Sequence, residues 1–296
     1  MMLAPPKLTT NSARVPFHES MEQAGCSPQQ NAEIILKRSL VHLPLLVTLS
    51  LCAAMLVHGP IAQLAHYHEF ADQSVLAGVP HAADVLSNIS FALVASWGIL
   101  RLWPMRGDAF SDAGRHGYRL FLAGLLLTSV GSSLYHLAPD DARLVWDRLP
   151  IALACAGLLS AVRAECMSKP DSRGDALLLG LFAVLSVGWW YFTAQNGEGD
   201  LRPYLLLQSL PLILIPLWQF IYRVPQRDRI AFGCALVLYV AAKLAELNDH
   251  ALLAALGFIS GHTIKHLLAA GAAAVLVARL VERQHAPQSL LSRVSA

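Results

Sequence analysis

Hydrophobic residues in this chain are gathered into eight long runs that short polar segments separate. A helix needs about 20 mostly apolar residues to cross the apolar part of a bilayer. The alternating pattern of a membrane β-barrel does not accompany these runs. The pattern therefore predicts an all-α polytopic transmembrane helical bundle, with spans at about 40–58, 84–103, 117–137, 145–163, 175–194, 203–223, 229–247 and 254–280.

Positive charges between the runs predict how the bundle is oriented. Lys and Arg accumulate in the cytoplasmic loops of membrane proteins. The segments 59–83 and 248–253 contain neither residue, and 138–148 contains only Arg143 and Arg148. The connections after the second, fourth and sixth spans, and both ends of the chain, carry two or more positive residues close to a span. Eight spans with both termini in the cytoplasm satisfy this rule throughout.

The overall composition agrees with a membrane protein. The chain has 296 residues, of which 55% are hydrophobic and 14% charged, whereas soluble domains average about 25% charged residues. The net charge of +2 gives no reason to expect a nucleic-acid partner. The five cysteines form no CxxC pair, so we interpret them as small buried apolar residues.

Five polar residues stand out because they lie in or beside apolar runs. They are Ser132, His136, Asp147, His262 and His266. Such residues are costly inside a membrane and usually mark a functional site. The predicted orientation places all five near the non-cytoplasmic side, although they come from three different spans. We therefore expect one active site toward that side.

The three histidines have the pattern of a metal site. His262 and His266 are four residues apart, so they share one face of a helix. That pair alone is a weak signal, because two histidines can equally hydrogen-bond to neighbouring helices. His136 at the same depth adds a third ligand, and catalytic zinc commonly takes three protein ligands and a water. The sequence thus predicts a Zn²⁺ site formed by these residues.

Ser132 and Asp147 are the candidate catalytic residues. Ser132 lies one turn from His136 and could donate a hydrogen bond to an oxyanion. The alternative is a bond to a carbonyl of its own helix, as serines in membrane helices often make. Asp147 could act as a general base for the attacking water, or form an ion pair with Arg143 or Arg148.

Other polar residues have structural interpretations. Lys243 and Glu246 are expected to pair near the outer surface. The amide of Asn88 is expected to link helices, as buried polar side chains do in membranes. His66, His68 and His81 fall in the first outer loop and are expected to be solvated.

In these motifs the sequence resembles the alkaline ceramidase family, part of a seven-span superfamily that also includes the progestin and adiponectin receptors. The resemblance covers about residues 80–282. It rests on Gly131-Ser132-xxx-His136, on Asp147-x-Leu-Pro150 after ten intervening residues and on His262-xxx-His266 in the last span. The run 84–88, Asp-Val-Leu-Ser-Asn, resembles the opening of the family's first core helix.

The resemblance implies a domain organisation with a seven-span catalytic core at 81–282. An extra amino-terminal span and its outer loop occupy 39–80, and polar cytoplasmic tails occupy 1–38 and 283–296, the first with a short helix near Asn31–Arg38. This extra span is one departure from the family. A second is that the stretch 78–84 lacks the acidic cluster that binds calcium in eukaryotic members, so no calcium site is implied.

The resemblance also implies an activity and roles for the residues. His136, His262 and His266 would hold zinc, while Ser132 and Asp147 would act on the oxyanion and the water. The expected function is a zinc-dependent intramembrane hydrolase that cleaves the amide bond of ceramide or a related N-acyl membrane lipid. The alternatives are a lipid-sensing receptor-like protein with little turnover, a metal or proton transporter, and a haem protein with paired histidine ligands.

Overall fold

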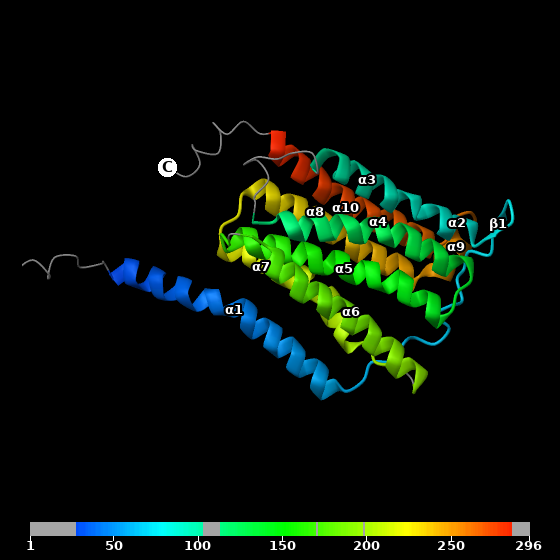
Figure 1. Cartoon of the computed structure of the whole chain (residues 1–296), viewed down its shortest axis with the longest axis horizontal. Coiled ribbons are helices and arrows are strands. Elements are labelled where there is room, and N and C mark those ends of the chain that lie inside the picture. Colours follow the sequence, from blue (N-terminus) through cyan, green and yellow to red (C-terminus); the bar gives the residue numbers. More distant parts are fainter. Residues whose placement is uncertain (1–27, 103–112, 170, 198, 286–296) are drawn as a thin grey trace, which may run out of the picture. The chain divides into compact units, whose positions relative to one another are not determined.

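The computed structural model describes residues 28–102, 113–169, 171–197 and 199–285, and this part of the chain is almost entirely helical. Eight of its helical segments are long and apolar enough to span a membrane, with α2 and α3 together forming one of them. The predicted all-α polytopic transmembrane bundle is confirmed (Figure 1). The elements are α1 (Pro28–His58), β1 (Val75–Leu76), β2 (Val79–Pro80), α2 (Ala82–Ser87), α3 (Ile89–Leu102), α4 (Arg115–Leu137), α5 (Asp141–Cys166), α6 (Arg173–Gln195), α7 (Arg202–Ile221), α8 (Gln226–Leu247), α9 (Asp249–Leu256) and α10 (Gly261–His285).

The boundaries of the predicted spans need correction at the two ends of the chain. The last span was predicted to begin at 254, but α9 ends at Leu256 and α10 begins only at Gly261. Gly257 ends α9 with φ of +78°, a left-handed conformation that glycine adopts without strain. The helix predicted near Asn31–Arg38 is continuous with the first span in α1. Of the predicted tails, residues 1–27 and 286–296 lie outside the described residues.

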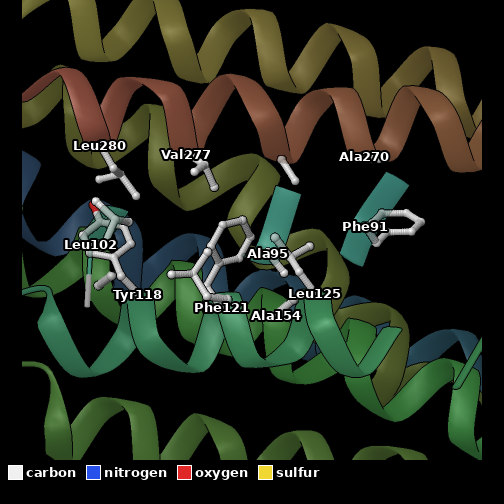
Figure 2. Close-up of a cluster of buried hydrophobic side chains, with 13 residues drawn as sticks. Phe91, Ala95, Leu102, Tyr118, Phe121, Leu125, Ala154, Ala270, Val277 and Leu280 are labelled. Carbon is white, nitrogen blue, oxygen red and sulfur yellow. The ribbon is translucent and has the colours of Figure 1, made fainter. Parts of the chain in front are cut away.

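The chain divides into two compact units, residues 1–42 and 43–296. Within the second unit, α4 packs along α5, and α10 packs along α8 and α3 (Figure 1). The close-up shows part of a core in which Phe91 and Ala95 from α3 meet Phe121 and Leu125 from α4 and Val277 from α10 (Figure 2). Because lipid tails are as apolar as these side chains, close packing is what favours association of the helices.

Two glycines permit the close helix contacts on which the site depends. A Cβ at Gly131 would lie 1.9 Å from the carbonyl oxygen of Trp146. A Cβ at Gly261 would lie 2.2 Å from the carbonyl oxygen of Ala245 and 2.7 Å from the Cα of Asp249. No side chain fits at either distance. Gly131 thus brings the α4 segment that carries Ser132 against the α5 segment that carries Asp147, and Gly261 brings the start of α10 against α9.

Candidate metal centre

Three histidine side chains from α4 and α10 meet in the interior of the protein. One ligand nitrogen from each of His136, His262 and His266 lies within 4.8 Å of the others. The ring centroids are 4.7 to 5.1 Å apart, and all three residues are buried. The predicted convergence of the three histidines is therefore confirmed, and they lie close enough together to bind a metal ion.

The ring nitrogens of these histidines are short of hydrogen-bond partners. Among the described residues, neither nitrogen of His136 has a partner, and Nε2 of His266 has none. A buried polar atom left without a partner costs about 1–3 kcal/mol, so native proteins rarely keep several together. A metal ion shared by the three rings would satisfy one nitrogen of each ring, and neutral imidazole nitrogens are ligands that zinc accepts readily.

Ser87 determines which nitrogen of His266 can act as a ligand. Its hydroxyl lies 2.8 Å from the carbonyl oxygen of Asp84 and 2.8 Å from Nδ1 of His266. The carbonyl can only accept, so the single hydroxyl proton of Ser87 is donated to Asp84. Nδ1 of His266 must then carry a proton and donate it to Ser87, which leaves the lone pair on Nε2.

We expect the cluster to bind zinc and Ser87→Ala to weaken that binding about 10- to 100-fold, because the ring of His266 loses the bond that fixes its tautomer and orientation. The measurement is a competition titration of the purified protein against a chelator of known zinc affinity. Ser90→Ala is a matched control, since the one bond of the Ser90 hydroxyl to a described residue is to the carbonyl of Ser87. Equal zinc affinities for Ser87→Ala and Ser90→Ala would contradict the role assigned to Ser87.

Lys265 is a site residue that the sequence interpretation missed. It lies on α10 with its Nζ 3.1 Å from Nε2 of His262 and 2.9 Å from a carboxylate oxygen of Glu246. The Glu246 carboxylate also forms an ion pair with Nζ of Lys243 at 2.8 Å, which confirms the predicted Lys243–Glu246 pair. Because an ammonium only donates, Nε2 of His262 accepts this bond. His262 would then bind a metal through Nδ1. Alternatively, it would bind through Nε2 once Lys265 bonds to Glu246 alone.

The loop between α1 and α2 covers the histidines. The ring of Phe70 lies 4.4 Å from that of His136 and 4.7 Å from that of His262, measured between centroids. Asp249 fastens this loop to the start of α10, because its carboxylate accepts the N–H of Ala71 at 2.9 Å and that of His262 at 2.7 Å. The loop therefore excludes water from one side of the cluster.

Asp72 fixes the end of the same loop. Its carboxylate accepts the backbone N–H groups of Ser74 and Asp84, each at 3.0 Å. Burial raises the pKa of Asp72, but the hydrogen bonds outweigh burial and hold this pKa below its usual value. The carboxylate is consequently ionised at neutral pH, when these bonds are strongest.

The expected solvation of the loop histidines holds for one of the three. His66 is exposed and bonds to Glu69. His68 is instead half-buried between the hydroxyl of Tyr135, at 2.9 Å, and Asp141, at 3.1 Å. His81 bonds to the backbone carbonyl of Asp72. The sequence pattern of a polar loop does not reveal that this segment folds back onto the helices.

Links between α2 and α10 also differ from those expected. The amide of Asn88 donates to the carbonyl of Asp84 in its own turn, so the prediction that it links helices is wrong. Asp84 makes the link instead, since its Oδ1 accepts the hydroxyl of Ser260 at 3.0 Å and that of Thr263. These contacts hold the start of α10 against α2, next to the Ser87–His266 bond.

Ser132 and Asp147 line a cavity of about 1000 Å³ that His262 and His266 also line. Ser132 is 1% exposed and makes no hydrogen bond to another described residue, whereas Ser133 and Thr128 donate to carbonyls of their own helix. The alternative interpretation of Ser132, a bond to its own helix, therefore does not apply. Asp147 is 5% exposed and forms no ion pair with Arg143 or Arg148 among the described residues.

Most of the cavity wall is apolar. Side chains from α3, α4, α5, α7, α8 and α10 contribute, among them Phe91, Phe121, Leu158, Leu212 and Leu236. Apolar pockets with a few polar groups at one place are typical of sites for small apolar ligands. No protein-family model, curated protein or solved structure matches the chain. The interpretation of the site therefore depends on its own residues.

Proposed function

We propose that the protein is a zinc-dependent intramembrane amidase that hydrolyses ceramide or a related N-acyl lipid. The observation that carries this proposal is the three-histidine cluster, of which His262 and His266 line a largely apolar cavity together with Ser132 and Asp147. A volume of about 1000 Å³ is at the upper end for small-molecule pockets and suits an acyl chain. The family resemblance of the motifs supports the same reaction.

The reaction adds water across the amide, so a C–O bond forms, the C–N bond breaks and the products are a fatty acid and an amine. Zinc, when bound, supplies a Lewis acid that polarises the carbonyl and acidifies water. Asp147 accepts a proton from the attacking water and passes it to the nitrogen of the leaving amine. The Ser132 hydroxyl, which has no competing partner among the described residues, donates to the carbonyl oxygen as negative charge develops there.

The surroundings of the site favour this chemistry. Phe70 and the loop that carries it limit access of bulk water to the histidines. In a site of low polarity, hydrogen bonds to a developing charge are stronger than in water. Charge distribution in the sequence places the site toward the non-cytoplasmic side, and this orientation stays a prediction.

Release of free fatty acid tests the proposal. Purified protein loaded with zinc is expected to release fatty acid from ceramide or another N-acyl lipid, to lose this activity in EDTA and to regain it when zinc is restored. A phosphatidylcholine carrying the same acyl chain in ester linkage is the control substrate. Lipid binding without any fatty acid release would contradict the amidase and favour the receptor-like alternative.

A further inference from the structure

Arg148 is a buried cation that the proposed reaction does not use. It lies on α5 and is 3% exposed. Its guanidinium carbon lies 4.0 Å from the centre of the Trp190 ring, 5.1 Å from that of Tyr67 and 5.5 Å from that of Tyr204. Three aromatic rings thus hold the group by cation–π contacts, which favour a charge but do not use its N–H donors.

The donors of this guanidinium have no partners within the described part of the chain. Arg148 makes no hydrogen bond and no ion pair with any described residue, and its Nη1 is buried without a partner. Asp147 precedes it directly in the chain, but adjacent residues of a helix point in different directions. Arginine stays protonated in proteins, so it cannot escape this cost by losing its charge. A buried arginine without a partner among the described residues favours binding of an anion.

The cavity offers the place for that anion. Arg148 lines the same cavity as His262, His266 and Asp147. The two other cations lining it, Lys243 and Lys265, already share Glu246. The carboxylate of Asp249 already accepts hydrogen bonds from two backbone N–H groups. Arg148 is therefore the cavity cation that lacks a counter-ion among the residues the structure describes.

We propose that Arg148 binds a carboxylate on the amine side of the lipid, so that the substrate class is an N-acyl amino acid rather than a neutral N-acyl alcohol. That this lipid is a substrate rests on the proposed amidase function, whereas the binding of its carboxylate to Arg148 does not. A guanidinium can form two parallel hydrogen bonds to one carboxylate, and the aromatic rings fix its plane for that contact. The acyl chain would occupy the apolar part of the cavity.

A pair of ligands that differ only at the head group tests the proposal. N-dodecanoylglycine and N-dodecanoylethanolamine share the chain and the amide, but only the first has a carboxylate. Isothermal titration calorimetry is carried out on full-length, EDTA-treated protein in phosphatidylcholine nanodiscs, so that no metal contributes to binding. We expect the glycine conjugate to bind at least about tenfold more tightly, as charge-assisted paired hydrogen bonds allow.

Arg148→Met is expected to remove this preference while the affinity for the ethanolamine conjugate changes less than about twofold. Arg143→Met is the matched control, because Arg143 lies on the same helix but is exposed and pairs with Asp140. Equal affinities of the two ligands for wild type, or an equal loss of both in Arg148→Met, would overturn the proposal and leave Arg148 a structural role. If Arg148→Met does not fold, Arg148→Lys replaces it. A reduced preference is then expected, since an ammonium cannot form the paired bonds, and an unchanged one would overturn the proposal.

Two further arms distinguish a carboxylate on the amine side of the ligand from a carboxylate on the acyl chain. Dodecanoate represents the fatty acid product, and an Arg148-dependent affinity for it without a preference for the glycine conjugate would overturn the head-group assignment. Hydrolysis by zinc-loaded protein is measured separately.

Cleavage of both conjugates at equal kcat/KM would support the amidase function and count against this inference. Arg148-dependent binding without hydrolysis would leave the inference standing as a binding site and count against the amidase.

Discussion

We expect zinc to stabilise the protein and the replacement of His136 with leucine to abolish that stabilisation. A ligand that binds only the folded state raises the free energy of unfolding by about 2.7 kcal/mol at a concentration 100 times its Kd. His136 is the only contribution of α4 to the histidine cluster, so its loss leaves two ligands on one helix. Thermal unfolding in detergent, with and without added zinc, measures the change as a shift in Tm.

Without metal, we do not expect the His136→Leu protein to be the less stable of the two. Both ring nitrogens of His136 are buried without partners in the described part of the chain, and each such atom costs about 1–3 kcal/mol. Leucine has a similar volume and no polar atoms, so metal-free His136→Leu is expected to be at least as stable as metal-free wild type. His66→Leu serves as the control, because His66 is exposed and lies outside the cluster. Zinc stabilising His136→Leu as strongly as wild type would contradict the metal centre.

The histidine cluster could be predicted because a membrane makes polar residues conspicuous. A histidine in a soluble helix is unremarkable, but His136, His262 and His266 stand in runs of apolar residues, where each is costly to bury. The spacing of His262 and His266 fixes their common face from helix geometry alone. The depth of His136 followed from the charge pattern, and these two local rules were enough to bring three distant residues together.

The surroundings of the cluster could not be predicted in this way. Phe70 and Asp72 belong to a loop without periodicity, and their contacts depend on how that loop folds across the helices. Ser87 contacts His266 because α2 and α10 meet, although the two residues are 179 positions apart in the chain. Lys265 had a usable signal, since it is a cation in an apolar run three residues after His262. Its carboxylate partner, Glu246, comes from another helix, and the sequence did not reveal that pairing.

Replacing Asp147 with asparagine is expected to lower kcat for amide hydrolysis about 10²- to 10⁴-fold, the range that general base catalysis commonly contributes. Asparagine keeps the shape of the side chain but cannot accept the proton of the attacking water. Asp147 has no hydrogen bond or ion pair to another described residue, so the substitution breaks no structural contact there. Zinc content is therefore expected to stay at the wild-type level, and metal analysis of the same samples separates loss of the base from loss of the metal.

Asp141→Asn gives the matched comparison for this prediction. Asp141 lies at the start of the same helix, but its side chain is 42% exposed and pairs with His68 at 3.1 Å. Because this carboxylate lies outside the cavity walls, its replacement is expected to leave kcat within about threefold of wild type. This change is far smaller than the loss expected when a general base is removed. An Asp147→Asn protein that retained its zinc and hydrolysed N-acyl lipids as fast as Asp141→Asn would assign the proton transfer to another group. Glu246, the carboxylate bonded to Lys243 and Lys265 in the same cavity, would then be the next residue to replace.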